Sequence, residues 1–277
     1  MKSKQLHISV VLYNNGDEIW DCINAILAST LDLRLFLIDN SETNELKKLA
    51  TDPRIIYTFN GLNIGYGSGH NIAMQRSLDE KAKYHLVMNP DISFQPGTLE
   101  HIYNYMEDHP KVGSLMPKVY YEDGSVQRLC KLLPTPFNLI GRRFFGEAPW
   151  AQQKNAAYEL HHFDYNSILN TPSLSGCFMF IRTNVLRKTG LFDPQFFLYL
   201  EDYDLNRRIH RVARTEFYPE VSVVHGHQQE SYKNGKLLKI HVQSAIKYFN
   251  KWGWLRDDER DILNSRVLEL IEESVNE

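Results

Sequence analysis

The sequence has little excess charge, few cysteines and no long apolar run. Its 277 residues carry a formal net charge of −3 at pH 7, whereas a protein that binds nucleic acid usually presents a strongly basic face. We therefore expect no nucleic-acid partner. The three cysteines, Cys22, Cys130 and Cys177, are odd in number and widely spaced. They fit neither a disulfide framework nor a zinc site, and they suit a reducing compartment.

Signals for membrane insertion or export are also weak. No stretch approaches the roughly 20 apolar residues that a membrane-spanning helix needs. The N-terminus is basic, but its apolar run is too short for a signal peptide and is more typical of a first strand. We see no internal repeat and no low-complexity segment. We therefore expect a cytoplasmic protein, and leave open a peripheral contact at the inner face of the cell membrane.

What the chain does contain is ordinary globular material, with 43% hydrophobic and 23% charged residues. This is enough for one large α/β domain with an appended subdomain. Near-continuous apolar runs separated by helical periodicity predict a mostly parallel sheet that is covered on both faces. In the first half these strands are expected at 7–13, 33–39, 55–59 and 84–89.

The second half is less regular. Residues 134–172 contain four prolines and show weak periodicity, so we predict a long irregular insertion, a kind of segment that often serves as a lid or partner surface. A short helix is expected to be capped by Thr183 and closed by Gly190. The other expected elements are strands at 112–121, 174–182 and 220–225, helices at 17–28, 98–109, 204–212 and 235–250, and an acidic helical tail from Asp257.

Ligands of open α/β sheets bind beyond the carboxyl ends of the strands, which directs attention to the residues after each run. Tyr13 and Asp39 follow or end the first two runs. The segment NIGYGSGHN (63–71) follows the third run and opens a helix. Its glycines would let the backbone approach a ligand, and a helix N-terminus favours an anion. Its glycines do not have the spacing of a dinucleotide-binding loop, and such a loop would follow the first strand. A glycine-rich turn without a ligand is an equally good interpretation.

Two acidic motifs could carry chemistry. Asn89-Pro90-Asp91 could hold a divalent cation that also binds phosphate oxygens, although this sequence is also a common turn. Glu201, Asp202 and Asp204 follow the apolar stretch FDPQFFLYL. A carboxylate beside an apolar wall is a candidate general base, because desolvation raises its pKa. Acidic residues also favour a helix N-terminus for purely structural reasons.

Two histidines, His225 and His227, end the last expected strand. A histidine beside a carboxylate site can bind a metal ion, but a histidine at a strand end is usually a surface residue.

The order of these motifs along the chain resembles the inverting family 2 glycosyltransferases with a GT-A fold, in particular the bacterial rhamnosyltransferase-like branch that builds O-antigen and related polysaccharides. The most specific part of the resemblance is 190–208. It implies a Rossmann-like nucleotide-sugar-binding domain with a mixed, mostly parallel sheet and a C-terminal helical extension. The expected division is a GT-A domain at 1–232, with a nucleotide-binding half (1–100) and an acceptor and catalytic half (101–232), followed by the extension at 233–277.

The resemblance also implies residue roles. Asp202 matches the catalytic base, with Glu201 and Asp204 supporting it. Asp91 matches a metal ligand for Mg or Mn, and His225 or His227 would join it. Asn89 stands where the family has an acid, which puts the strength of metal binding in doubt. The implied donor-binding residues are Tyr13, Asp39, Asn63, Gly65, Gly69, Asn89, Asp91 and Gly176, of which Asp39 would read a pyrimidine base and Gly176 would leave room for a sugar.

The implied reaction moves a sugar from a nucleotide diphosphate to a hydroxyl of a glycan acceptor, which relatives often carry on a polyprenyl diphosphate. The branch favours dTDP-rhamnose as donor, with a UDP-linked galactofuranose or hexosamine as the alternative. Lysines beside Trp252 and Trp254 suit an interfacial helix, or the tryptophans pack on the domain.

Two rival functions remain. A nucleotidyltransferase would usually show a basic glycine-rich loop after the first strand, where this chain has Tyr13-Asn14-Asn15-Gly16-Asp17. An inactive nucleotide- or glycan-binding module is the other, and the presence of Asp91 and Asp202 argues against it.

Overall fold

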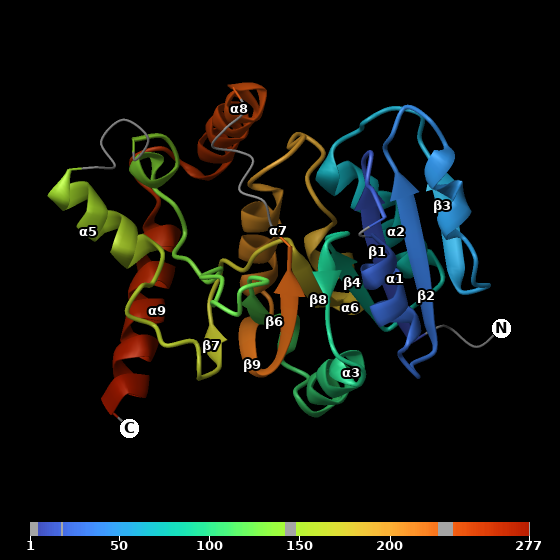
Figure 1. Cartoon of the computed structure of the whole chain (residues 1–277). Coiled ribbons are helices and arrows are strands. Elements are labelled where there is room, and N and C mark those ends of the chain that lie inside the picture. Colours follow the sequence, from blue (N-terminus) through green and yellow to red (C-terminus); the bar gives the residue numbers. More distant parts are fainter. Residues whose placement is uncertain (1–4, 18, 142–147, 227–234, 277) are drawn as a thin grey trace.

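A mixed sheet forms the centre of the molecule, with helices on both of its faces (Figure 1). The computed structural model describes residues 5–17, 19–141, 148–226 and 235–276. Within these residues the sheet has nine strands in the order β3-β2-β1-β4-β8-β6-β9-β5, and β7 pairs with β9. The strands are β1 (Leu6–Leu12), β2 (Leu33–Asp39), β3 (Ile55–Phe59), β4 (Tyr84–Met88), β5 (Ile92–Ser93), β6 (Val112–Tyr120), β7 (Leu169–Asn170), β8 (Phe178–Arg182) and β9 (Arg214–His225).

The strand directions confirm the expected mostly parallel first half and mixed sheet. The four strands β3, β2, β1 and β4 run parallel to one another, while β8 is antiparallel to both β4 and β6. Parallel pairing resumes between β6 and β9. The short strand β5 is antiparallel to the end of β9, with Ile92 opposite His225. This last pairing joins segments that are far apart in the sequence, and it matters for the site.

The helices connect these strands and cover the sheet. They are α1 (Ile19–Leu27), the 3-10 helix η1 (Glu45–Leu49), α2 (Tyr66–Asp79), α3 (Thr98–Asp108), the π-helix η2 (Phe137–Gly141), α5 (Pro149–Tyr158), α6 (Thr183–Thr189), α7 (Glu201–His210), α8 (Gly235–Trp252) and α9 (Asp258–Asn276).

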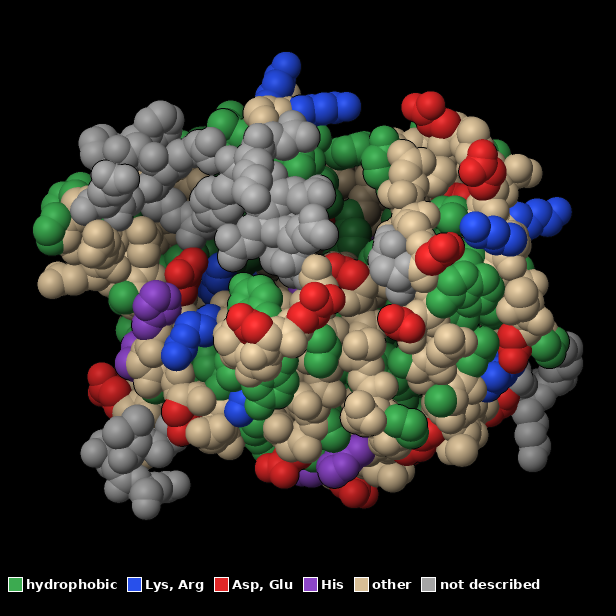
Figure 2. Space-filling model, viewed as in Figure 1, with side chains coloured by type: hydrophobic (Ala, Val, Ile, Leu, Met, Phe, Trp, Pro, Cys, Tyr) green, Lys and Arg blue, Asp and Glu red, His purple; other side chains and the backbone are tan. Residues whose placement is uncertain are grey.

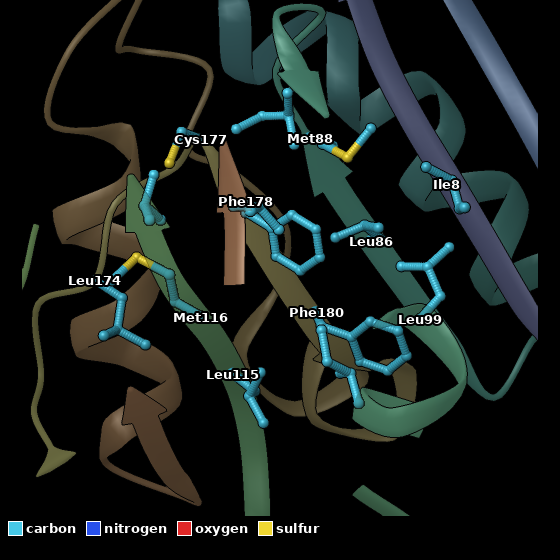
Figure 3. Close-up of a cluster of buried hydrophobic side chains, with 14 of the residues drawn as sticks. Ile8, Leu86, Met88, Leu99, Leu115, Met116, Leu174, Cys177, Phe178 and Phe180 are labelled. Carbon is cyan, nitrogen blue, oxygen red and sulfur yellow. The ribbon is translucent and has the colours of Figure 1, made fainter. Parts of the chain in front are cut away.

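The two faces of the sheet bury separate apolar clusters, because successive side chains of a strand point to opposite faces. On one face Leu86, Met88, Phe178 and Phe180 pack beneath α1 and α3, and Figure 3 shows part of this cluster with Leu99 of α3. The opposite face carries a second cluster, to which α2, α6 and α7 contribute. Its buried members are Met74, Val87, Met179, Ile181, Val185, Leu186, Phe192, Leu205 and Ile209. Both faces are therefore covered, as the apolar runs predict.

Two local predictions need correction. The 134–172 segment is not irregular throughout, since it contains η2, α5 and β7. Helix α5 begins at Pro149, which is a favoured first helical residue because its missing N–H has no partner to lose there. Thr183 does not cap α6. It is the first residue of that helix, and its hydroxyl donates to the carbonyl oxygen of Ala82, with the carbonyl oxygen of Lys83 at 3.0 Å.

The C-terminal helices pack on α7 and on the loop before it. The indole N–H of Trp252 donates to Asp204 Oδ1 (2.9 Å), and the ammonium of Lys247 donates to the carbonyl of Gln195. Trp252 therefore packs on the domain, one of the two alternatives that the sequence leaves open, whereas Trp254 is 38% exposed and Leu255 is 89% exposed. In the described part of the chain, we find no helix with the length and apolar character to cross a membrane.

Candidate active site

Candidate residues collect at the edge of the sheet where the parallel strands end. Tyr13 follows β1, Asp39 ends β2 and Asn89 follows β4, and these three strands are neighbours in the sheet. Figure 2, which has the same orientation as Figure 1, shows a recess in the upper part of the molecule, with hydrophobic side chains at its bottom and acidic side chains near it. This is the position at which open α/β sheets bind ligands.

Asp202 is held in a fixed orientation by two backbone N–H groups. The N–H of Gly176 donates to Asp202 Oδ2 (2.9 Å), and the N–H of Tyr203 donates to Oδ1 (2.8 Å). Burial raises the pKa of Asp202 above its ordinary value, and the two N–H donors limit that rise. A methyl group on Gly176 would lie 3.1 Å from Asp202 Cβ. Gly176 therefore leaves room for the carboxylate itself, whereas the resemblance assigns it room for a sugar.

The backbone before Asp202 adopts an uncommon conformation. Tyr199 (φ 71°) and Leu200 (φ 68°) are consecutive non-glycine residues in the left-handed region, which costs of order 1–3 kcal/mol each. Helix α7 begins immediately after them at Glu201. The turn thus places two carboxylates at a helix N-terminus, where the helix dipole favours negative charge. Strain of this kind, when observed, indicates a functional site.

Glu201 is a buried carboxyl group beside Asp202, which is itself partly exposed. It is 4% exposed, and its Oε2 has no hydrogen-bond partner among the residues that the structure describes. Burial and then the charge of Asp202 raise the pKa of Glu201 to about 8. At neutral pH Glu201 is therefore the neutral acid of the pair, and it places no negative charge beside Asp202.

We predict that the Glu201→Gln variant is stabilised relative to the native protein as the pH rises. The native folded state keeps a proton that the unfolded chain releases between the ordinary pKa of 4.5 and about 8. Its contribution to stability is complete below 4.5 and is lost as the pH rises through 8, at about 1.4 kcal/mol per pH unit. Urea unfolding at several pH values between 5.5 and 7.5 measures the difference in unfolding free energy. For the exposed control Glu42→Gln, the difference in unfolding free energy from the native protein should not change with pH. If the difference for Glu201→Gln also does not change with pH, Glu201 is ionised.

The third acid of the motif does not join this pair. Asp204 Oδ2 accepts from the guanidinium of Arg208 (2.9 Å), and Asp204 Oδ1 accepts from Trp252 and Lys251. Two residues along a helix are about 200° apart around its axis, so Asp202 and Asp204 point to different sides of α7. Asp204 connects α7 to α8, and the structure does not bring it to the carboxylate pair that the resemblance assigns it to support.

Asn89, Asp91 and His225 do lie together. His225 Nε2 is 3.3 Å from Asp91 Oδ1 and 3.2 Å from Asn89 Nδ2. The pairing of β5 with β9 causes this proximity, because it places His225 opposite Ile92. Within the described residues, no three His, Cys, Asp or Glu side chains are arranged to hold a metal ion. His227, the alternative ligand, lies outside those residues.

Tyr66 is a site residue that the sequence analysis does not identify. Its hydroxyl lies 2.7 Å from the carbonyl oxygen of Gly176 and 3.0 Å from Asn89 Oδ1. It therefore connects the Asn-Pro-Asp segment to the loop that orients Asp202. An aromatic residue at the start of a helix carries no distinctive signal, since most such residues pack in the core.

Packing explains all three glycines of the glycine-rich segment. A methyl group on Gly67 would lie 2.9 Å from Phe192 Cβ. Gly65 has φ +93°, and a methyl group on it would lie 2.5 Å from the carbonyl oxygen of Phe197. A methyl group on Gly69 would lie 2.8 Å from Val11 Cγ2 of β1. All three positions therefore require glycine whether or not a ligand binds. Asn63 Oδ1 accepts from the N–H of Gly65 (3.0 Å) and shapes the turn.

Asp39 and Tyr13 flank the same edge but differ in exposure. The Asp39 carboxylate is fully buried, where Oδ1 accepts from the N–H of Ser41 (2.8 Å) and Oδ2 from the hydroxyl of Tyr57 (2.5 Å). Tyr13 is 50% exposed. Tyr13 therefore has a free face on which a ring could stack, while a base would have to reach Asp39 past the groups that already bind it.

Comparison with known proteins agrees with this geometry. A family model described as Glycosyl transferase family 2 matches residues 8–190. The chain is 25% identical, over 79% of its length and 75% of the relative, to an N-acetylglucosaminyl-diphospho-decaprenol L-rhamnosyltransferase of Mycobacterium tuberculosis. It is 22% identical to the rhamnosyltransferase WbbL of Escherichia coli, over 88% of this chain and 92% of that protein.

The fold has solved relatives as well. The mannosyltransferase PcManGT from Pyrobaculum calidifontis, solved with GDP-Man and Mn2+, superimposes with a TM-score of 0.58 at 16% identity, over 89% of this chain and 65% of that chain. The mixed sheet with its C-terminal helices is therefore the GT-A fold that the resemblance implies. The family match covers more than half of the sequence and includes Asp39, Asn89 and Gly176. The chain belongs to glycosyltransferase family 2.

Proposed function

We propose that the protein is an inverting rhamnosyltransferase that moves rhamnose from dTDP-rhamnose to a hydroxyl of a lipid-linked glycan, in the synthesis of a cell-surface polysaccharide. The observation that carries the reaction type is the Asp202 carboxylate, oriented by two backbone N–H groups beside the neutral acid Glu201. The names of two relatives, both rhamnosyltransferases, support the sugar. The name of one of them includes a diphospho-decaprenol acceptor, which supports the lipid linkage.

The proposed reaction is a single displacement. Asp202 accepts the proton of an acceptor hydroxyl, whose oxygen forms a bond to the anomeric carbon while the bond from that carbon to the diphosphate breaks. The configuration inverts, and no covalent intermediate with the protein forms. A general base of this kind contributes typically 10²- to 10⁴-fold to the rate. The fixed orientation of Asp202 contributes further, because a positioned group avoids the entropic cost of alignment.

Asp91 and His225 fit a divalent cation such as Mg or Mn. A carboxylate and an imidazole are suitable ligands for Mn, and sites that act on phosphates often use only one or two protein carboxylates together with the substrate's own oxygens. When bound, the cation neutralises charge on the leaving diphosphate. Asn89 is neutral and replaces an acid at this position, so the protein contributes less charge than an Asp-x-Asp motif would, and we expect a modest affinity for the metal.

On the donor side, Asp39 is proposed to accept the N3–H of thymine or uracil and Tyr13 to lie beside the base. Both dTDP-sugars and UDP-sugars satisfy this contact, so UDP-galactofuranose or a UDP-hexosamine is the alternative donor. Adenine offers no donor at the equivalent position.

A thermal-shift panel of nucleotide sugars, with and without Mn, tests the donor. Binding to the folded state raises the unfolding free energy by about 2.7 kcal/mol at a ligand concentration of 100 Kd. We expect dTDP-rhamnose with Mn to raise the melting temperature most, and adenine nucleotide sugars to leave it unchanged. A larger shift from a UDP-sugar would replace the donor, and stabilisation by an adenine nucleotide sugar alone would contradict the role of Asp39.

We also predict that Asp91→Ala weakens the metal-dependent part of donor binding and lowers activity, with the fold intact. The variant removes one of the two charged or basic side chains that face the proposed cation. Titration of the donor with and without Mn measures the effect, and the exposed Asp108→Ala variant at the end of α3 controls for the loss of one negative charge. If native activity persists in excess EDTA, the reaction needs no cation.

A further inference from the structure

We propose that Gln127 is a positioning residue that holds His225 in the tautomer whose Nε2 lone pair faces Asp91 and the proposed cation. This inference rests on the proposed function, because it specifies how the cation site is completed. Gln127 is 2% exposed and His225 is 5% exposed, and their side chains meet at Gln127 Oε1 and His225 Nδ1 (3.0 Å).

The orientation of the Gln127 amide is determined by its other contacts. Gln127 Nε2 donates to the carbonyl oxygen of His225 (2.9 Å), and the carbonyl oxygen of Tyr120 lies at 3.4 Å from the same nitrogen. Exchanging the oxygen and nitrogen of the amide would place an acceptor against these carbonyl acceptors. The atom that faces His225 Nδ1 is therefore the amide oxygen, which can only accept.

The tautomer of His225 follows from this. Because Gln127 Oε1 accepts, His225 Nδ1 carries the hydrogen, and in a neutral imidazole the other nitrogen then has a lone pair. That nitrogen is the one beside Asp91 and Asn89. The usual arrangement of a metal-binding histidine is the same, with one ring nitrogen donating to a fixed acceptor and the other free to bind the ion.

The opposite side of the site places an amide group against the same nitrogen. Asn89 Nδ2 lies 3.2 Å from His225 Nε2, and Asn89 Oδ1 lies 3.0 Å from the hydroxyl of Tyr66. That hydroxyl has one hydrogen and also lies 2.7 Å from the carbonyl oxygen of Gly176, which can only accept. The tautomer of His225 is therefore assigned from its contact with Gln127 alone.

A purely structural role for Gln127 is the competing explanation, because its amide also satisfies two buried carbonyl groups. That role predicts a loss of stability and no specific effect on His225. Gln127→Met keeps the approximate length of the side chain and removes the acceptor. Gln127→Glu restores an acceptor for His225 Nδ1 without restoring the amide donors, and so separates the two roles.

The experiment measures Mn2+ binding by calorimetry in the presence of dTDP, together with the 15N NMR signals of His225 in the metal-free protein. We expect native His225 to carry its hydrogen on Nδ1. Gln127→Met should lose this preference and bind Mn2+ about 10- to 100-fold more weakly, the usual effect of losing an outer partner of a metal-binding histidine. Gln127→Glu should recover part of the affinity. Combining Gln127→Met with His225→Ala should weaken binding no further than His225→Ala alone, since the two act through one nitrogen.

A native His225 with its hydrogen on Nε2 would overturn the proposal, and so would native-like Mn2+ affinity in folded Gln127→Met. If the native protein binds no Mn2+ in the presence of dTDP, the metal requirement in the proposed function is contradicted, and the role of Gln127 is still undecided by that result. The NMR comparison then decides the role of Gln127, because an unchanged His225 tautomer in Gln127→Met overturns it and a changed tautomer supports it.

Discussion

The Asp202→Asn variant should lose transfer activity by about 100- to 10,000-fold, the usual range for removal of a general base, while donor binding stays close to native. Asparagine keeps the shape of the side chain but cannot take the proton of the acceptor hydroxyl. Its amide group also replaces one of the two oxygens that accept from Gly176 and Tyr203, which costs on the order of 1–3 kcal/mol of stability. The melting temperature must therefore be measured beside the turnover.

Glu201→Gln is the matched control for this variant, because the two residues are adjacent and desolvation raises the pKa of both carboxyl groups. If Glu201 is already neutral at pH 7, the amide changes little, and the variant should keep most of its turnover. Initial rates with saturating donor, and donor affinity by calorimetry, separate the two residues. A large loss in Glu201→Gln together with near-native turnover in Asp202→Asn would transfer the role of base to Glu201.

The strands β1, β2 and β4 could be predicted because they are buried on both faces. Such strands are near-continuous apolar runs, and the expected range 33–39 coincides with β2. The edge strand β3 is only partly buried, and the expected range 55–59 coincides with it because its residues are mostly β-branched or aromatic. Helix α5 was missed because its sequence has little periodicity, with Ala151 and Tyr158 as its buried residues. Its helical form depends on Pro149 and on tertiary contacts, which a local pattern does not contain.

A buried polar network inside the apolar strands could not be predicted from the sequence. Ser9 lies within β1, yet its hydroxyl is 2.6 Å from His70 Nδ1 and 2.8 Å from His85 Nε2 in the interior. Burial lowers the pKa of His70 to about 3 and that of His85 well below its ordinary value, so both are neutral. His70 belongs to the glycine-rich segment, but it points into the fold, because helix α2 turns that face toward β1 and β4.

Candidate site residues could be named from the sequence where a local signal was sufficient, as for Asp91 just after the fourth strand and Asp202 just after an apolar stretch. Their roles stay predictions. Partners that long-range pairing supplies could not be predicted. Gln127 is 98 positions from His225, and it follows an ordinary Asp-Gly turn. Trp252 is 48 positions from Asp204, so the acidic motif gave no indication that its third member binds the C-terminal extension.

The Asp257→Asn variant should lose about 3 kcal/mol or more of unfolding free energy, because removing one partner of a buried ion pair typically costs 3–5 kcal/mol. Arg207 is 1% exposed, and its guanidinium donates to both oxygens of Asp257 (2.7 and 2.5 Å). Glu259 accepts from the same guanidinium (2.9 Å) and offsets part of the loss. Arg207 lies on α7, the helix that begins with Glu201 and Asp202, and Asp257 directly precedes α9.

Urea unfolding of Asp257→Asn measures this cost, and Glu269→Gln is the control, since it removes a negative charge from an exposed position of α9 and should change stability by no more than about 0.5 kcal/mol. If the two variants have equal unfolding free energies, the ion pair of Arg207 with Asp257 does not contribute to stability. The shape of the transition carries a second result. Because the ion pair joins the start of α9 to α7, we expect the predicted extension at 233–277 to unfold together with the rest of the chain in one transition. An earlier, separate transition that Asp257→Asn shifts alone would instead make the extension an independent unit that docks on α7 through this pair.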